Sequence, residues 1–274
     1  MRIAEAFAKS FQAAGYKTNL QRLKEDVEIT NLEHALMFLV FPVHSFSAPE
    51  IVYKWIESLE TVEQRLAAVI SVSGGGEMLS NTACRHRVNK LFDAKGYKVF
   101  YEDMIVMPSN CIVATKEPIA KILLEMFPEK VDLIVGDVIR GKARRTKPKL
   151  IDYLITRLGE SEKKITTRFG REIAVTDRCD GCGLCVKNCP ANNISLVAKR
   201  AVFADACHLC LSCIYICPQN ALEPQYGKVM VIRAGYDLDA LEKLELDTSQ
   251  INVKRYTRGF IWNGVRRYIL EHRK

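Results

Sequence analysis

Apolar residues along the first half of the chain follow two different periods. They recur every three to four positions in four segments, which predicts helices at 3–14, 49–59, 80–95 and 117–140. Between these segments lie continuous apolar runs, typical of strands buried on both faces, at 35–43, 65–72 and 98–106. A short strand is also expected at 17–20. Helices that alternate with such strands predict an α/β fold with a doubly wound parallel sheet.

Two loops follow the predicted strands at the edge where parallel α/β sheets bind ligands. The first contains His44 and Phe46, whose flat side chains are suited to flank a ring system. The second, Ser73-Gly74-Gly75-Gly76, offers backbone N–H groups that no glycine Cβ atom hinders. The plainer interpretation is that His44 and Phe46 pack a loop and that the glycines form an ordinary turn.

Cysteine marks the second half of the chain. Eight of the ten cysteines lie between Cys179 and Cys217. They spell C-x2-C-x2-C-x3-C-P twice, and the second copy starts 28 residues after the first. Flanking residues recur with it, Asp177 as Asp205 and Asn192 as Asn220. Disulfide frameworks belong mainly to small secreted domains, so this local density instead indicates one metal-binding motif that is used twice.

The spacing of the cysteines suits an iron-sulfur cubane. Three cysteines set two residues apart can reach three irons of one cube, and the fourth iron needs a ligand from elsewhere. Gly181 and Gly183 would let the backbone approach such a cluster closely. The competing interpretation, a pair of structural zinc sites, normally needs separated C-x2-C pairs or mixtures of cysteine and histidine. The pattern therefore favours two [4Fe-4S] clusters, with His208 expected to be a surface residue rather than a ligand.

Residues 171–226 resemble the bacterial two-cluster ferredoxins. In that family the fourth cysteine of each run binds the other cluster. The resemblance therefore implies two sets of ligands, Cys179, Cys182, Cys185 and Cys217 for one cluster, and Cys207, Cys210, Cys213 and Cys189 for the second. Short strands with alternating β-branched residues are expected around the ligands, at 171–177, 193–203 and 228–233.

Taken together, the two halves resemble prokaryotic proteins that fuse a flavodoxin-like domain to a two-cluster ferredoxin. The resemblance rests on the cysteine runs, on Phe41-Pro42-Val43 with Pro49, and on Gly74 to Gly76. It implies that FMN binds between the loop after the 35–43 strand and the glycine-rich loop. The implied cofactor-binding residues are Pro42, Val43, His44, Phe46, Ser73, Gly74, Gly75 and Gly76.

One feature of the flavodoxins is missing from the sequence. A flavodoxin begins with a central strand and a loop that holds the FMN phosphate at the start of the first helix, whereas Met1 already stands at that helix. Loss of a central strand would leave its neighbours with unpaired backbone groups. We therefore expect the α/β domain to be N-terminally truncated by about 12 to 15 residues, the length of one strand and its loop, and FMN binding to depend on them.

Positive charge is concentrated between Arg140 and Arg171, where eleven lysines and arginines accompany three acidic residues. Since the net charge is +8, the rest of the chain sums to zero. Such a stretch could dock an acidic partner, a nucleic acid or an anionic membrane surface. No aromatic platform for bases is interleaved with it, so we interpret it as a solvated linker and expect no nucleic acid.

These features divide the chain into four predicted parts: a flavodoxin-like domain at 1–147, the basic linker at 148–170, a ferredoxin domain at 171–226 and a C-terminal extension at 227–274. The extension ends in a helical segment with one apolar face, formed by Ile261, Val265, Tyr268 and Ile269. That face suits a membrane surface or a partner, but packing against its own domain is the simpler expectation.

No membrane span or signal peptide is evident. The longest apolar stretch, 35–43, contains a proline and falls short of the roughly 20 residues that a span needs, and Glu5 and Lys9 interrupt the N-terminal segment. We therefore expect a cytoplasmic protein. Cys84 and Cys111 lie outside the cysteine runs and are expected to be packing cysteines, with Cys111 near the flavin loops.

Three functions are compatible with these features. The leading hypothesis is electron transfer between redox partner proteins through two [4Fe-4S] clusters, coupled to an FMN that accepts one or two electrons, so that the fusion converts between one- and two-electron steps. The alternative is a reductase whose flavin reduces a small molecule and whose clusters feed it. A third hypothesis is an iron-sulfur protein with structural clusters that binds an anionic partner.

Overall fold

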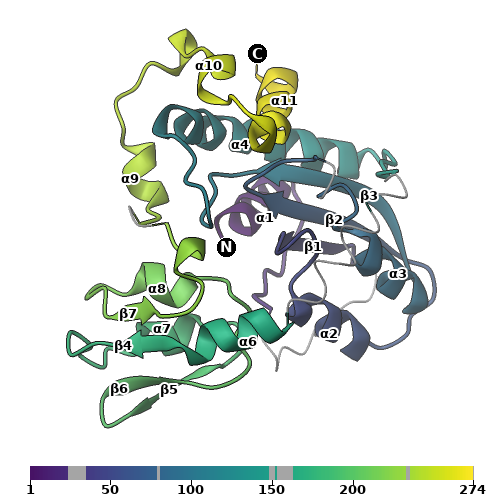
Figure 1. The fold of residues 1–274 in the computed structure, drawn as a ribbon. Coiled ribbons are helices and arrows are strands. Elements are labelled where there is room, and N and C mark those ends of the chain that lie inside the picture. The colour runs from purple at the N-terminus through teal and green to yellow at the C-terminus, as the bar shows by residue number, and fades with distance from the viewer. Residues whose placement is uncertain (24–34, 79–80, 148–151, 153–162, 233–234, 274) are drawn as a thin grey trace.

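The computed structural model describes residues 1–23, 35–78, 81–147, 152, 163–232 and 235–273. Figure 1 shows two parts, a sheet covered by helices and a smaller module of short strands and helices. The C-terminal segment runs back from the smaller part onto the larger one. Most of the basic linker predicted at 148–170 lies outside the described residues.

The larger part is built on three parallel strands in the order β1 (Met37–Pro42), β2 (Arg65–Ser73) and β3 (Tyr97–Val106). Ala67 to Ile70, in the middle of β2, are fully buried, as a central strand between two layers of helices requires. The three long strands predicted from the apolar runs are confirmed. Among the described residues β1 has a strand neighbour on one side only. The result is a mixed α/β fold, and its likeness to flavodoxin stays a prediction.

The strand predicted at 17–20 is wrong. Lys17, Thr18, Asn19 and Leu20 have no regular secondary structure, and most of this segment is exposed. Strand preference depends on packing against cross-strand and same-face neighbours, and these mostly polar residues pair with no other described strand.

Helices cover both faces of the sheet. On one face lie α1 (Arg2–Ala13) and α4 (Glu117–Ile139), and on the other lie α2 (Glu50–Ser58) and α3 (His86–Ala94). All four were predicted, but α3 starts later than the predicted residue 80. Just before it, the Asn81 amide donates to Ser73 Oγ and to the Gly76 carbonyl, both at 3.0 Å. These bonds tie the preceding segment to the end of β2.

A network of buried charges lies between β2, β3 and the segment before α3. The Arg85 side chain is 1% exposed and donates to Ser71 Oγ at 2.5 Å, to Glu77 at 2.6 Å and to Glu102 at 3.3 Å. Arg145 bonds to the buried Glu102 at 2.5 Å. Because a buried guanidinium needs compensating partners, this network should make Arg85 essential to the fold.

Part of the basic stretch also serves this buried network. Arg144 pairs with the buried Asp103 at 2.8 Å, as Lys130 does at 2.9 Å, and Arg145 pairs with Glu102. Arg144 and Arg145 are 44% and 43% exposed, so they stay in contact with solvent, and they also neutralise carboxylates that β3 carries into the interior. Sequence composition does not show where a cation's partner lies.

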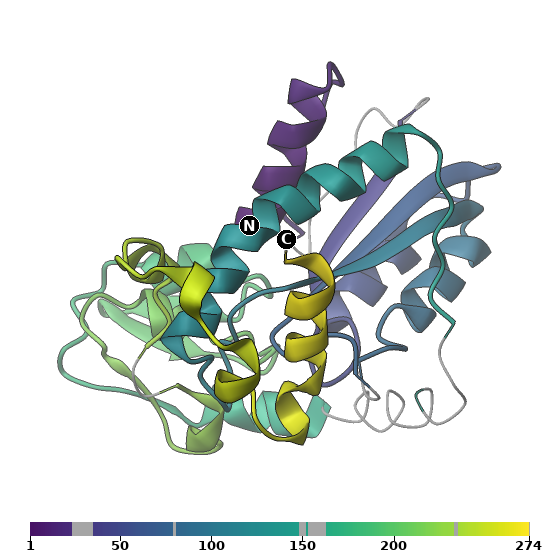
Figure 2. The ribbon, with the colours of Figure 1, turned by 90° about the horizontal axis from the view of Figure 1, so that it is seen from above.

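The C-terminal segment contributes α9 (Leu238–Glu242), α10 (Val253–Tyr256) and α11 (Asn263–His272). Seen from above in Figure 2, α11 lies against the middle of α4. Val265, Tyr268 and Ile269 are buried there, whereas Ile261 is exposed. The expectation that this helix packs on its own chain is confirmed.

Gly264 allows α11 to approach the glycine-rich loop very closely. A Cβ atom at Gly264 would lie 2.2 Å from the Gly75 carbonyl oxygen, and one at Gly76 would lie 2.6 Å from Gly264. We expect Gly264→Ala to lower the stability by about 1–3 kcal/mol, the usual cost of overpacking, measured as the shift in urea midpoint. Leu270→Ala, at an exposed position of the same helix, should shift it little. Equal shifts for the two variants would contradict the close packing.

The smaller part begins with α6 (Lys163–Arg171), whose Phe169 is buried in the core of the module. It continues with β4 (Ile173–Val175), α7 (Leu184–Asn188), β5 (Ile194–Val197), β6 (Arg200–Phe203), α8 (Ser212–Ile216) and β7 (Leu222–Pro224). Strand β4 pairs with β7, and β5 pairs with β6, both antiparallel.

The strands predicted at 171–177 and 193–203 are present in part, as β4 and as the β5–β6 hairpin. The strand predicted at 228–233 is wrong in its described residues, because Lys228–Met230 forms a 3-10 turn. Two of its apolar residues, Met230 and Val231, pack against the module's core without forming a ladder, and Val231 makes a single bridge to Cys111. The partner of β4 is the short β7, which follows the second cysteine run.

Candidate functional site

The 28-residue sequence repeat is also a structural repeat. Helix α8 starts and ends 28 residues after α7. Asn192 and Asn220 both have left-handed backbones, with φ of 48° and 45°. The backbone N–H of Asn193 lies 3.3 Å from Cys189 Sγ, and that of Ala221 lies 3.3 Å from Cys217 Sγ. The two halves therefore present their cysteines in the same way.

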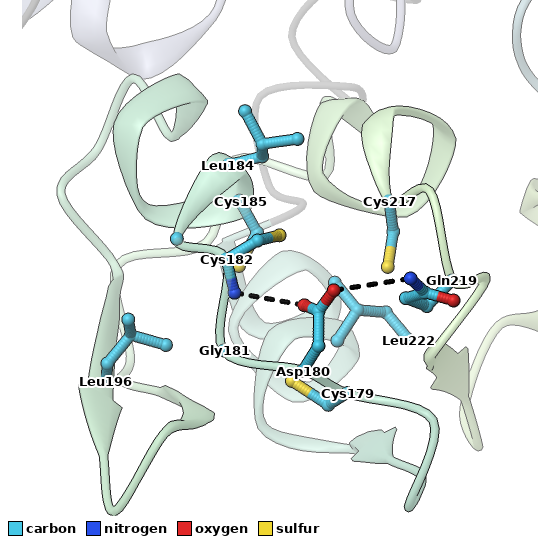
Figure 3. A pocket seen from close by; sticks show the side chains of 11 residues that line it. Cys179, Asp180, Gly181, Cys182, Leu184, Cys185, Leu196, Cys217, Gln219 and Leu222 are labelled. Atoms are coloured by element: carbon cyan, nitrogen blue, oxygen red, sulfur yellow. Dashed lines mark hydrogen bonds between the residues drawn. The ribbon is translucent and has the colours of Figure 1, made fainter.

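The thiols of the first predicted set line one hollow. Cys179, Cys182, Cys185 and Cys217 surround it, together with Asp180 and Gly181 (Figure 3). The fourth cysteine comes from the second run, so the crossed arrangement implied by the ferredoxin resemblance is spatially possible. Asp180 accepts a hydrogen bond from the Cys182 N–H at 3.0 Å and one from Gln219 at 3.2 Å, which links the two runs across the hollow.

Gly181 fixes the shape of the first cysteine loop. Its φ is +74°, and a Cβ atom there would lie 2.6 Å from the Lys199 carbonyl oxygen in the β5–β6 turn. Residues with a side chain rarely adopt this backbone conformation, and the space here is too small for a Cβ atom. In the second run the same place is taken by Leu209, which adopts φ of 52°. The second loop thus keeps the same left-handed backbone even though the residue there is not glycine.

The second predicted set is more deeply buried. Cys207, Cys210 and Cys213 lie close to Cys189, which again comes from the other run. Burial raises the pKa of the Cys207 thiol to about 11, and it raises the pKa of Cys213 further. Metal ligation needs thiolates, so cluster assembly at these cysteines has to release protons.

A large cavity of about 1310 Å³ separates this second set from the sheet. One wall comes from the iron-sulfur side, formed by Pro190, His208, Cys210 and Ser212. Facing it are groups at the carboxyl end of the sheet: Pro42, His44, Met107 and Asn110. From there the cavity runs along the edge of β1 that faces away from β2, where α1 contributes apolar side chains: Ile3, Ala4, Phe7 and Phe11. Both parts of the chain therefore form one site.

His44 joins the two walls directly. It follows β1 in a tight turn in which His44 and Ser47 exchange backbone hydrogen bonds at 2.9 and 2.8 Å. Its imidazole hydrogen-bonds to the backbone of His208. Burial, followed by the nearby His208 ring, lowers the pKa of His44 to about 4, so the imidazole is neutral at pH 7. His208, expected at the surface, is instead partly buried at the cavity wall.

The other residues implied as flavin contacts do not line this cavity. Phe46 is 41% exposed, and Val43 bonds through its N–H to the Val72 carbonyl at 2.8 Å. A Cβ atom at Gly74 would meet the Ser109 side chain at 2.8 Å. Ser73, Gly75 and Gly76 bind Asn81 or lie against α11, as described above. Of the eight implied residues, Pro42 and His44 are the two that face the cavity.

Other contacts between the two parts come from residues that sequence patterns did not single out. The Tyr215 hydroxyl, within the second cysteine run, donates to the Asn110 carbonyl and accepts from the Ile232 N–H, both at 2.8 Å. Tyr236 lines the cavity, stacks near Tyr215 with ring centroids 5.8 Å apart, and donates to the Pro108 carbonyl. Tyrosines with a hydroxyl partner are common where an apolar interface needs a polar anchor.

The two cysteines outside the runs serve packing. Cys84 is buried in the larger part, as expected. Cys111 was expected near the flavin loops, and it does not line the cavity. It lies against the core of the iron-sulfur module, and its neighbour Asn110 faces the cavity.

FMN, the cofactor implied by the flavodoxin resemblance, is compatible with this cavity in size and polarity. Pockets for ligands of that size measure about 300–1,000 Å³ and have apolar walls with a few polar groups, and at about 1310 Å³ this cavity is large enough to admit FMN. Here aromatic and aliphatic side chains form the walls, and His44, Asn110 and Tyr236 supply polar groups near the iron-sulfur side. The first turn of α1 also lines the cavity, and the positive end of a helix favours a phosphate. This end of α1 could therefore take the place of the upstream loop on which FMN binding was expected to depend.

Comparison with known families supports the interpretation of the cysteines. Residues 171–218 match the family described as "4Fe-4S dicluster domain". No curated protein matches the chain. The chain therefore carries a 4Fe-4S dicluster domain, which supports iron-sulfur electron transfer. No helix in the described ranges is both long and apolar enough to cross a bilayer.

Proposed function

We propose that this protein is an electron carrier in which two [4Fe-4S] clusters work together with an FMN held in the large cavity. The observation that carries the proposal is the shared wall: Cys210, a predicted cluster ligand, faces the same cavity as Pro42 and His44 at the end of β1. A molecule bound there would touch both parts of the chain. Free thiols destined for iron also suit a reducing compartment, so we expect the protein to work in the cytoplasm.

The residues at the cavity have distinct tasks in this proposal. The apolar side chains of α1 and β1 exclude water from a flat ring, and His44 and Tyr236 orient it at the iron-sulfur end. A flavin supplies one- or two-electron chemistry, whereas each cubane carries one electron. Hydrogen bonds to the cysteine sulfurs, such as that from Leu209 to Cys207 at 3.3 Å, tune the cluster potentials.

The cavity can be filled from α1 without touching the cysteines. Ala4 lines the cavity, and Ala13, on the same helix, is exposed and lies outside it. We expect Ala4→Trp to weaken FMN binding at least about tenfold, because an indole takes the space of the ligand and every tenfold change corresponds to about 1.4 kcal/mol. Binding is measured by quenching of FMN fluorescence in an anaerobic titration.

Ala13→Trp is the matched control and should bind FMN as the unaltered chain does. Iron and sulfide are quantified in the same samples and should stay at about eight per chain in both variants, as two cubanes require. Unchanged FMN affinity in Ala4→Trp, or no measurable FMN binding by the unaltered chain, would contradict the flavin part of the proposal.

The size of the cavity favours one further candidate, a flavin-dependent reductase of a small molecule. At about 1310 Å³ the cavity exceeds the usual 300–1,000 Å³ of a single organic ligand, so a substrate would have room beside the ring. A reductase predicts catalytic turnover with a specific small acceptor, whereas a carrier exchanges electrons with proteins only. A panel of small oxidants, followed by steady-state oxidation of the reduced protein, separates the two.

A further inference from the structure

The two predicted cluster sites have different surroundings. The second set, Cys189, Cys207, Cys210 and Cys213, lies on the side of the module that faces the α/β part. Cys210 forms part of the cavity wall, and the neighbouring His208 is bonded to His44. The Tyr215 hydroxyl closes the same side through its bonds to Asn110 and Ile232. The α/β part therefore blocks a protein partner from reaching this site on that side of the module.

The first set faces outward. Cys182 is exposed, and none of the cysteines of this set lines the large cavity. Leu184 and Leu196 line the hollow of these cysteines (Figure 3) and are 37% and 42% exposed. Val197, next to Leu196 on the β5–β6 hairpin, is 59% exposed. Apolar side chains grouped around an exposed metal ligand mark an interaction surface rather than scattered surface residues.

Charges frame this apolar group. Lys187 lies one helical turn after Leu184 on α7, and Lys199 lies in the β5–β6 turn against Gly181. Neither lysine has an ion pair within the part of the chain that the structure describes. Arg178 and Arg200, also exposed, each pair with one carboxylate, and Asp180 is held by hydrogen bonds inside the loop. The uncommitted charges at the rim are therefore mainly positive.

We infer that the face formed by Leu184, Leu196, Val197, Lys187 and Lys199 is the docking surface for an acidic one-electron carrier protein. The inference rests on the proposed function, since it needs a working cluster at Cys179, Cys182, Cys185 and Cys217. The reduced carrier gives up one electron, and that cluster accepts it. No bond is formed or broken, and no proton is transferred. The apolar centre and basic rim match the small interfaces of transient redox complexes.

A charge-reversal pair tests this surface. Lys187→Glu/Lys199→Glu changes the rim, and Lys9→Glu/Lys90→Glu changes the net charge equally at exposed positions of α1 and α3. The probe is a purified acidic [2Fe-2S] ferredoxin. Its binding to the iron-loaded chain is measured by calorimetry, and electron transfer from its reduced form is measured by stopped flow, both at several salt concentrations.

At low salt, Lys187→Glu/Lys199→Glu should lower both the affinity and the second-order rate constant of electron transfer about tenfold or more. Both quantities should also depend less on salt, because electrostatic steering is lost. The control pair should stay within about twofold, because its charges lie away from the surface. Equal losses in both variants, or no salt-dependent binding by the unaltered iron-loaded chain, would overturn the inference. Absence of iron and sulfide from the purified protein would instead overturn the proposed function.

Discussion

Two double variants of the cysteines are expected to differ sharply in iron content. Cys182→Ala/Cys217→Ala should keep about four irons per chain, and Cys213→Ala/Cys217→Ala should keep almost none. The reason is the crossed arrangement. Cys217 lines the hollow of Cys179, Cys182 and Cys185, so the first pair of substitutions removes two ligands from one cluster and leaves the other cluster intact. The second pair removes one ligand from each cluster. Each of these clusters also joins the two halves of the module.

The measurement is iron and sulfide per chain after anaerobic reconstitution, with Cys111→Ser as control because that thiol lies outside both sets. The control should retain about eight irons. If each run instead held its own cluster, the order would reverse: Cys213→Ala/Cys217→Ala would keep four irons and Cys182→Ala/Cys217→Ala would lose most of both. Such a reversal would contradict the assignment of ligands.

The second large effect is expected at Arg85. Arg85→Met should lower the free energy of unfolding of the α/β part by about 3–5 kcal/mol, the cost of breaking a buried ion pair and leaving its partners uncompensated. Glu102 is 3% exposed and would lose one of its two cations, while Glu77 and Ser71 would lose their donor. Urea unfolding followed by the fluorescence of the buried Trp55 reports on this part of the chain.

Arg87→Met is the matched control. Arg87 lies two residues further on, is 38% exposed in its side chain, stacks on Tyr53 and makes a 3.9 Å pair with Glu57. Exposed pairs of this kind contribute about 0–1 kcal/mol, so its midpoint should move little. Similar urea midpoints for the two variants would show that the buried network around Arg85 does not stabilise the fold.

The periodicity of the sequence predicts most of the large elements for a clear reason. Helix α4 and strand β2 bury apolar residues continuously or at regular intervals, and such patterns reflect local geometry. The cysteine spacing likewise predicts its cluster module, because the ligands of each loop are near neighbours in sequence. Structure that depends on residues close together in the sequence can therefore be predicted from the sequence.

The cavity, by contrast, could not be predicted, because it depends on how separate segments meet. His44 and His208 are far apart in the sequence, and neither residue carries a pattern that points to the other. The glycine-rich loop was expected at a flavin and instead admits Gly264 of α11. Small residues show that something approaches closely, but they do not show what approaches.

Buried charge was missed for a related reason. Arg85 looks like a surface residue in a sequence, since arginine is almost never fully buried unless it is paired. Arg144 and Arg145 are exposed, and their sequence gives no sign that each pairs with a buried carboxylate. Their partners, Glu102 and Asp103, lie in the middle of β3, where an acidic pair interrupts an apolar strand. That interruption was the available signal, and it indicates that cations must come from elsewhere in the fold.

The central claim is that two interlocked cysteine runs hold two redox-active [4Fe-4S] clusters. Its most direct test is low-temperature EPR spectroscopy of the anaerobically purified chain, reduced stepwise and with its iron quantified. The account predicts about eight irons and two one-electron cluster signals, which broaden each other when both clusters are reduced. A colourless protein that contains zinc and stays EPR-silent on reduction would contradict it.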